Sequence, residues 1–341
     1  MWPKICWVIL TFTLSLAFAS AQTPTPPGKL VDLGGHRLHV NCVGKGAPVV
    51  VVETGLGDFS FDWILVQNRL AKLTRTCTYD RAGYAWSDPG PLPRTYAQLN
   101  LELHDALNKL GERGPFILVG HSFGGGVVRN YATTYPSEVA GMVLADIVQE
   151  DQRIPMEPGK AARVRDFAQG RPIPPPHENM LASDKPNLTA AADPPPTAAP
   201  TIEAPYDKLP AEQQRWHLWA ESLPALEAAE SSQREWSAES MALMHATPQQ
   251  GILGAIPLLV LTRKEGGYGN DLNVPAAEME AERLHTQSQL TLLSSNGRQV
   301  IIDSGHNMNL EVPNIVAAAI SDVVVLCRQS PQLRVSRGSR P

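Results

Sequence analysis

The chain has 341 residues, of which 43% are hydrophobic and 18% charged, and its formal net charge is −5 at pH 7. A chain of this length can bury a large core, and the absence of a basic stripe argues against nucleic acid as a partner. The cysteines and histidines show neither a CxxC pair nor metal-ligand spacing, so we expect no metal and no other cofactor.

The N-terminus has the features of an export signal. Residues 1–21 contain a single lysine, Lys4, then an apolar segment from Ile5 to Phe18, and the small residues Ala19-Ser20-Ala21 match a cleavage site. The apolar part is short for a membrane span, although an uncleaved anchor is the alternative. We therefore expect a signal peptide over 1–21, a Pro-rich linker over 22–29, and an exported protein, periplasmic or extracellular, without stable membrane association after cleavage.

A continuous β-branched run begins the central part of the chain. Val49-Val50-Val51-Val52 is typical of a strand buried on both faces of a parallel sheet. It ends at Glu53 and is followed by the glycine-rich loop Thr54-Gly55-Leu56-Gly57. A backbone N–H group in such a loop, here that of Leu56, can stabilise a developing oxyanion, and an ordinary strand-to-loop turn is the alternative.

A second apolar run leads into a nucleophile motif. Phe116-Ile117-Leu118-Val119 precedes Gly120-His121-Ser122-Phe123-Gly124, and a stretch that can begin a helix follows. A GxSxG turn between strand and helix holds its serine in a strained conformation that only small neighbours permit. The pattern predicts Ser122 as a nucleophile, with the N–H groups of Leu56 and Phe123 as the oxyanion hole.

The segment over 147–255 is too long for one crossover helix and is rich in proline. Its second half has helical spacing, and Trp216, Trp219 and Met244 belong to its apolar positions. We expect a helical cap over Ser122 in which these three side chains contact the substrate. The alternative is that they pack the cap against the core.

The C-terminal part supplies a candidate base. Val300-Ile301-Ile302 is typical of a short strand, and Ser304-Gly305-His306 follows it in a loop. A neutral imidazole with an ordinary pKa of about 6.5 can accept the serine proton, so His306 is the predicted general base. The other histidines are expected to be surface or packing residues, and we expect His121 to be buried beneath the turn. The Arg-rich residues 329–341 are expected to form a disordered tail.

Together these motifs resemble the α/β-hydrolase fold over about residues 30–328. The matching segments are Gly55-Leu56-Gly57, the run from Tyr79 to Ser87, the Ser122 turn and Ser304-Gly305-His306. The resemblance implies a mostly parallel central sheet with helices on both faces, built from residues 30–146 and 256–328 around the inserted cap. Many relatives carry His where this chain has Thr54 and Gly where it has Ala85, so the loop geometry near the oxyanion site is expected to differ.

The acid of the triad has two candidate positions. In the commoner arrangement of the family it follows the strand over 256–262, which leaves Glu265 and Asp271. In some members, including haloalkane dehalogenases, it lies one strand earlier, where Val139 to Ala145 leads into Asp146. We favour Asp146 because it emerges directly at a strand terminus, and the alternative is a carboxylate that caps a turn without chemistry.

The resemblance also places Cys42 and Cys77 on neighbouring strands of the family's sheet. In an oxidising compartment these two cysteines either form a disulfide or remain two buried thiols, and both alternatives stay open. Cys327 has no partner in either case.

A serine nucleophile favours attack on an acyl carbon over the aspartate attack of epoxide hydrolases and haloalkane dehalogenases. The predicted function is a secreted serine hydrolase that cleaves carboxylic esters of a small-molecule acyl substrate through an acyl-enzyme. A proline-iminopeptidase-like aminopeptidase or amidase and a lactone hydrolase remain alternatives, and so does a non-catalytic binding protein with this fold. Nothing in the sequence indicates an oligomeric state.

Overall fold

The computed structural model describes residues 23–157, 159–177, 201–268 and 274–329. The expected signal peptide, nearly all of the expected tail and Asp271 lie outside these residues. None of the helices in the described ranges is long and apolar enough to cross a membrane.

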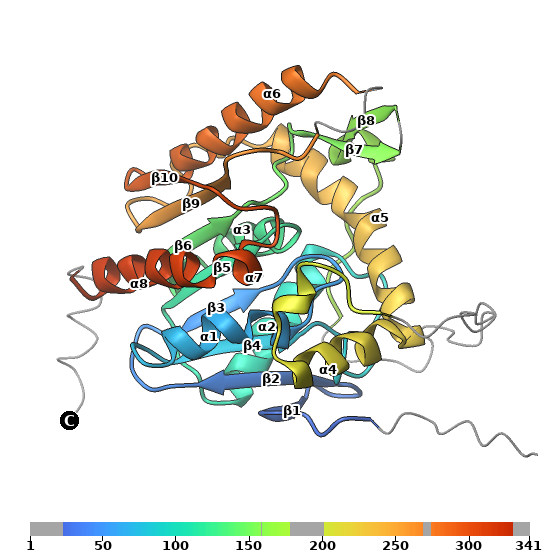
Figure 1. The fold of residues 1–341 in the computed structure, drawn as a ribbon, viewed down its shortest axis with the longest axis vertical. Helices are drawn as coiled ribbons and strands as arrows, with labels where there is room; N and C mark the ends of the chain where they lie inside the picture. The colour runs from blue at the N-terminus through green and yellow to red at the C-terminus, as the bar shows by residue number, and fades with distance from the viewer. Residues whose placement is uncertain (1–22, 158, 178–200, 269–273, 330–341) are drawn as a thin grey trace, which may run out of the picture.

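A single eight-stranded sheet organises the fold, with strand order β1-β2-β4-β3-β5-β6-β9-β10 (Figure 1). Strand β2 is antiparallel to β1 and β4, and the other neighbours are parallel. The strands are β1 (Lys29–Asp32), β2 (Arg37–Val43), β3 (Val50–Glu53), β4 (Thr76–Asp80), β5 (Phe116–His121), β6 (Val139–Ala145), β9 (Leu258–Arg263) and β10 (Gly297–Ile302). The expectation of a mostly parallel central sheet is confirmed.

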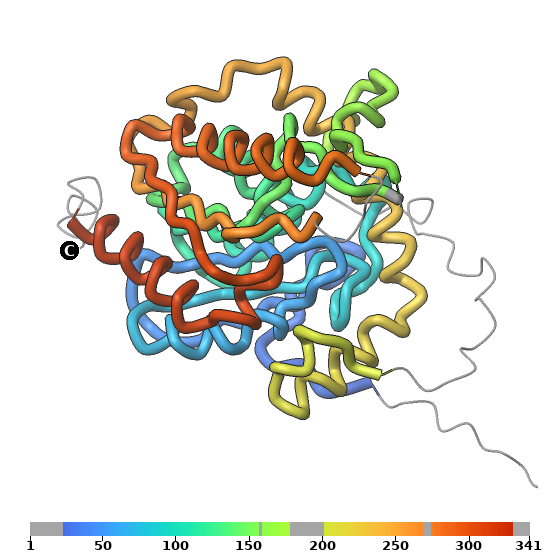
Figure 2. Tube along the Cα trace, turned by 45° about the horizontal axis from the view of Figure 1, so that its top comes forward, coloured from blue at the N-terminus to red at the C-terminus, as the bar shows by residue number. Residues whose placement is uncertain are grey.

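Helices cover both faces of this sheet. α2 (Tyr96–Lys109) and α3 (Gly124–Thr134) supply side chains to the core on one face, and α1 (Ile64–Leu70) and α8 (Pro313–Gln329) supply the other. Figure 2 shows α1 and α8 side by side, in light blue and red. Two further helices, α6 (Ala276–Gln289) and α7 (Met308–Glu311), flank β10 in the sequence.

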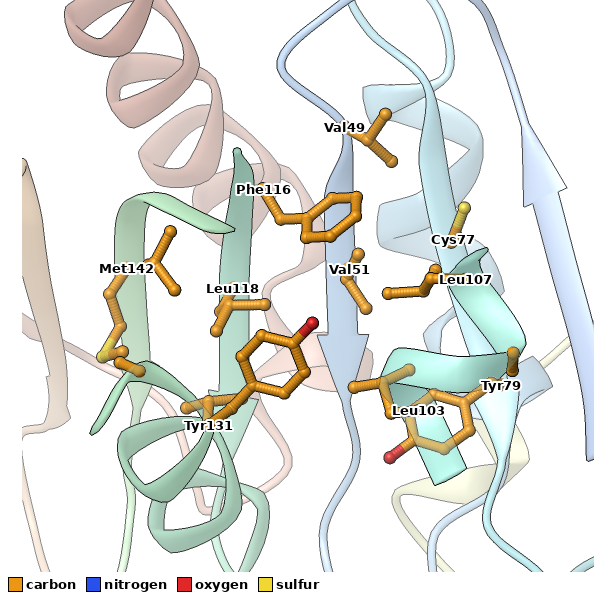
Figure 3. Close-up of a cluster of buried hydrophobic side chains, with 14 of the residues drawn as sticks. Val49, Val51, Cys77, Tyr79, Leu103, Leu107, Phe116, Leu118, Tyr131 and Met142 are labelled. Carbon is orange, nitrogen blue, oxygen red and sulfur yellow. The ribbon is translucent and has the colours of Figure 1, made fainter. Parts of the chain in front are cut away.

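The central strands bury both of their faces. Val49 and Val51 point into the core beneath α2 and α3, whereas Val50 and Val52 point into the core beneath α1 and α8. Figure 3 shows the first of these cores, where Leu103 of α2 lies beside the strand residues. This alternation follows from the two-residue repeat of a strand, and it explains why the strands appear in the sequence as unbroken apolar runs.

A disulfide joins the antiparallel part of the sheet to the parallel part. Cys42 of β2 and Cys77 of β4 face each other in register and are bonded, with a sequence separation of 35 residues. Closing a loop of this size restricts the unfolded chain and typically stabilises a protein by about 2–4 kcal/mol. Of the alternatives left open above, the structure has the disulfide, and Cys327 is a free, buried thiol.

A long insertion lies between β6 and β9, and we call residues 146–257 the insertion. Its first part contains a hairpin, β7 (Arg153–Glu157) and β8 (Lys160–Arg163), and a short turn of 3-10 helix over Val164–Phe167. Its second part contains a 3-10 turn over Tyr206–Lys208 followed by α4 (Ala211–Glu221) and the long helix α5 (Pro224–Ala246), which runs along one side of the molecule (Figure 1). The two helices agree with the helical spacing of the sequence, whereas the hairpin was not predicted.

Candidate active site

Ser122 occupies a sharp turn between β5 and α3. Its φ is +51°, in the left-handed region that non-glycine residues rarely adopt. The turn needs glycines around it: a Cβ at Gly124 would lie 2.4 Å from the carbonyl oxygen of Glu53, and one at Gly125 would lie 2.1 Å from Cγ2 of Ile147. Strain of this kind at a non-glycine residue is concentrated at functional sites.

Asp146 and His306 meet beside this turn. Asp146 follows β6 directly and also has a positive φ, +42°. Its Oδ2 lies 2.6 Å from Nδ1 of His306, which follows β10. Because a carboxylate can only accept, the Nδ1 nitrogen carries the hydrogen and the Nε2 nitrogen is left as the proton acceptor. The carboxylate is buried, whereas the His306 side chain is 38% exposed and therefore accessible to a reactant.

Two arginines surround the Asp146 carboxylate. Arg263, at the end of β9, places its Nε 3.2 Å from Oδ2 and its backbone N–H 3.4 Å from Oδ1, and Arg283 of α6 lies 3.7 Å from Oδ1. Burial by itself raises the pKa of Asp146, but the hydrogen bond from His306 and the charge of Arg263 bring that pKa below its ordinary value. Asp146 is therefore an anion throughout the neutral range.

The environment of His306 favours its neutral form. Although one side of the ring is exposed, the surrounding protein removes water from the rest of it, and this desolvation lowers the pKa of His306 most. The hydrogen bond to Asp146 opposes this effect, and the charges of His121 and Arg263 lower the pKa further. The net pKa of His306 lies below its ordinary value of 6.5. The imidazole can thus act as a base at neutral pH, which a protonated ring cannot do.

A cavity of about 760 Å³ opens at Ser122. Leu56 and Phe123, the two expected oxyanion-hole residues, line it next to the serine. Its other walls come from the insertion, mainly from the hairpin and one face of α5: they are Val148, Ile154, Pro155, Met156, Val164, Phe167, Gln169, Arg171, Ser231, Arg234, Glu235, Ser237, Ala238 and Met241. The arrangement can hold an acyl compound against the Ser122 hydroxyl.

His121, the residue before the serine, is in contact with His306. His121 Nε2 lies 2.9 Å from the carbonyl oxygen of His306, and the two ring centroids are 4.8 Å apart. Among the described contacts, no hydrogen bond joins the Ser122 hydroxyl to His306. Such bonds are often long in a resting hydrolase and shorten when substrate binds.

The family follows from comparison with known proteins. Residues 49–319 match a model of the alpha/beta hydrolase family. The chain belongs to the alpha/beta hydrolase family. The expected resemblance is thereby confirmed, and the fold agrees with solved members of the family.

Individual relatives of this chain are distant. An uncharacterized protein of Bacillus subtilis, YqjL, is 25% identical over 291 residues, which cover 85% of this chain and 89% of that protein. An uncharacterized vacuolar membrane protein of Saccharomyces cerevisiae is 31% identical over 134 residues, or 34% of this chain and 21% of that protein. The chain spans only about a fifth of the length of the first curated relatives that it matches.

Among solved structures, a thermophilic esterase from Thermogutta terrifontis superposes with a TM-score of 0.55 at 22% identity, covering 86% of this chain and 94% of that one. At this identity the likeness shows the shared fold alone.

Three predicted substrate contacts need correction. Trp216 and Trp219 of α4 do not line the Ser122 cavity but pack with core aromatics; Trp86 lies 5.0 Å from Trp216 and 5.4 Å from Trp219 between ring centroids. Met244 packs with Tyr96 and Phe123 in a separate cluster. Trp216 and Trp219 hold the insertion on the core, because α4 docks on the 3-10 turn over Ser60–Trp63. Met244 belongs to α5 and packs behind Phe123 rather than lining the Ser122 cavity.

The sequence also offered Glu265 and Asp271 as alternative acids. Glu265 is exposed beyond the end of β9, and Asp271 is outside the described residues. Sequence reasoning missed Arg263 and Arg283 as partners of Asp146. Arg263 carried a usable signal, since it ends a strand parallel to the one that leads into Asp146, and the carboxyl ends of such strands share one edge.

Substitution of the two carboxylates distinguishes the candidate acids. We expect Asp146→Asn to lower kcat for ester hydrolysis by about 10³–10⁴-fold, because the His306 ring loses the acceptor that fixes its tautomer. Glu265→Gln is the matched control and should change kcat by less than about twofold, because its side chain points to solvent. Steady-state kinetics on variants with unchanged circular dichroism decide the matter. An equal or larger loss in the Glu265 variant would overturn the assignment.

Proposed function

We propose that this hydrolase cleaves carboxylic esters through an acyl-enzyme, with Ser122 as nucleophile, His306 as general base and Asp146 as the residue that orients and stabilises the imidazole. The observation that carries the proposal is the 2.6 Å contact between His306 and Asp146 beside a serine held in a left-handed turn. These are the three chemical parts that acyl transfer requires, and they open onto the cavity through Ser122.

The proposed reaction has two halves. His306 Nε2 takes the Ser122 proton while Oγ attacks the acyl carbon, and the oxyanion that forms accepts hydrogen bonds from the N–H groups of Leu56 and Phe123. When the intermediate collapses, the C–O bond to the alcohol breaks and His306 returns the proton to the leaving oxygen. Water then attacks the acyl-enzyme with His306 again as base, which releases the acid and restores Ser122.

The charges of the insertion favour an ester over an aminoacyl substrate. An aminopeptidase would need a carboxylate free to bind the substrate ammonium. Glu235, the acidic residue in the cavity wall, pairs with Arg171, which also lies 2.9 Å from Glu239. Glu230 lies 3.4 Å from Arg234. Each of these carboxylates already has a cationic partner, which supports the ester reading.

The cavity also supports a substrate with an apolar acyl or alcohol group. Ile154, Val164, Ala238 and Met241 line it, and the side chains of Met156 and Phe167 in its wall remain 43% and 52% exposed. Each methylene buried against such a surface contributes about 0.8 kcal/mol. We therefore propose that this hydrolase prefers esters with several methylenes over acetyl esters.

The nucleophile is tested by burst kinetics. The substrate is p-nitrophenyl butyrate. When deacylation is slower than acylation, we expect the wild-type enzyme to release up to one equivalent of p-nitrophenol per active site in a burst, followed by steady turnover. Ser122→Ala should lose at least about 10³-fold in kcat, because neither acylation nor general-base relay remains. Full activity in this variant would refute the proposal.

The proposed preference for longer acyl chains is tested by a substitution that fills the cavity. Ala238→Phe should lower kcat/KM for octanoyl esters relative to acetyl esters by about 30-fold, because a blocked site for two or three methylenes costs about 2 kcal/mol. Ala246→Phe on the same helix is the control, since Ala246 is exposed and lies outside the cavity wall. A ratio that Ala238→Phe leaves unchanged would show that the acyl chain binds elsewhere.

We also propose export to an oxidising compartment, with residues 1–21 removed. The Cys42–Cys77 disulfide supports this, because such bonds persist in secreted and periplasmic proteins and are rare in the cytosol. Intact and peptide mass spectrometry of the native protein without reductant should find a chain beginning at residue 22 with these two cysteines bonded. A full-length chain with free thiols would contradict the proposal.

A further inference from the structure

His121, the residue before Ser122, is enclosed by two hydrogen-bond acceptors. Only 1% of its side chain is exposed. Its Nδ1 lies 3.2 Å from Oδ2 of Asp58, and its Nε2 lies 2.9 Å from the carbonyl oxygen of His306. A ring in this position contacts the glycine-rich loop on one side and the loop of the candidate base on the other.

Neither of these partners can donate a hydrogen. The carbonyl of His306 has only lone pairs, and Asp58 is held as a carboxylate by further donors: the Gly55 N–H lies 3.2 Å from Oδ2 and the Tyr206 hydroxyl 2.7 Å from Oδ1. A neutral imidazole has only one N–H group. Its other ring nitrogen would then point a lone pair at the lone pairs of an acceptor oxygen, which is repulsive. Both contacts can be hydrogen bonds only if both ring nitrogens carry hydrogen, and the ring is then an imidazolium.

We propose that His121 is a positioning residue that stays protonated across the neutral range, where it holds the His306 loop in place and keeps the His306 ring neutral. The part of this inference that concerns catalysis rests on the proposed function; the charge of His121 does not.

The local charges agree with this assignment. Burial raises the pKa of Asp58, but hydrogen bonds and charge from His121, with the Tyr206 hydroxyl, bring that pKa down to about 2. Burial lowers the pKa of His121, and its contacts with Asp58 outweigh this and raise the pKa above the ordinary value. The buried pair thus consists of an anion and a cation.

The imidazolium affects His306 in two ways: its charge acts on the His306 ring, and its hydrogen bond holds the His306 backbone carbonyl. With the ring centroids 4.8 Å apart, its positive charge opposes the uptake of a second proton by His306. Several other groups also set the charge around the His306 loop. They are Asp146 at Nδ1, Arg263 and Arg283 beside Asp146, Asp58 behind His121, and Glu311, whose Oε2 lies 2.6 Å from the Gly305 N–H. Removing His121 leaves the two nearby carboxylates Asp58 and Asp146 to favour protonation of His306.

The same contacts tie the base to the insertion. Tyr206 belongs to the insertion, and its hydroxyl reaches the carboxylate that binds His121. A continuous series of hydrogen bonds therefore runs from Tyr206 through Asp58, His121 and the backbone of His306 to Asp146. Correct seating of the Tyr206 turn and correct placement of the base are coupled through this series.

The charge state can be measured without any substrate. In long-range ¹H–¹⁵N spectra of the resting protein, assigned by comparison with His121→Gln, both ring nitrogens of His121 should resonate as protonated nitrogens from pH 6 to pH 8. One protonated and one bare nitrogen would overturn the inference. This readout is independent of catalysis, so it separates failure of the inference from failure of the proposed function.

The effect on the base is measured by the pH profile of kcat/KM. In His121→Gln, the acid limb should move to higher pH by about 0.5–1 unit, because a neighbouring cation has been removed. His39→Gln is the matched control: the His39 side chain is also fully buried, with Nδ1 2.7 Å from Asp80 Oδ2, but it belongs to β2 and contacts neither Tyr206 nor His306 among the described residues. Its acid limb should not move. An unmoved limb in His121→Gln, or equal shifts in both variants, would contradict the inference.

Discussion

The hydrogen bond between Asp146 and His306 connects two loops that are 160 residues apart in the sequence. It can form only because β6, β9 and β10 are parallel neighbours whose carboxyl ends lie at one edge of the sheet, next to the end of β5 that carries Ser122. Ser122 and Asp146 both leave their strands in the left-handed conformation, which costs on the order of 1–3 kcal/mol at each residue. The strands buried on both faces offset this cost and hold the two turns against relaxation.

A second set of buried charges fixes the loop that faces the serine. Arg81 pairs with Glu53 at 2.7 Å and donates to the carbonyl oxygens of Thr54 at 2.9 Å and Gly55 at 2.6 Å. Thr54 in turn donates its hydroxyl to the backbone of Asp58. The Arg81 guanidinium thus holds the backbone whose next N–H group, that of Leu56, belongs to the expected oxyanion hole. The loop is ordered before substrate arrives, as electrostatic stabilisation of an oxyanion requires.

The sequence predicted the parts of the site that depend on local pattern. Ser122 and the glycine-rich loop were recognisable because a strand, a tight turn and small residues follow one another within a few positions. Asp146 was favoured over Glu265 because it ends a strand, and the hydrogen bond to His306 agrees with that argument. The structure also shows the two positions where this chain differs from many relatives. The Thr54 hydroxyl donates to the backbone carbonyl of Asp58, and Ala85 adopts a positive φ of +38° where many relatives carry glycine.

What could not be predicted depends on how distant elements pack. Helical spacing placed Trp216 and Trp219 on an apolar face, but it could not say whether that face contacts Ser122 or the aromatic cluster around Trp86. The charge of His121 and the position of Arg283 depend on contacts between elements far apart in the sequence, which no local pattern encodes. The hairpin β7–β8 was missed because its strands are short and because β7 contains a proline, Pro155, which argues against a strand.

The most direct measurement is the pH dependence of the rate at which a fluorophosphonate labels Ser122, with the site of labelling identified by peptide mass spectrometry. Labelling needs the nucleophile and its base but no leaving-group chemistry of a particular substrate. Because the pKa of His306 is lowered, the rate should fall on the acid side with a midpoint below 6.5. Labelling elsewhere than Ser122, or a midpoint above 6.5, would contradict an account in which a neutral His306, oriented by Asp146, activates this serine.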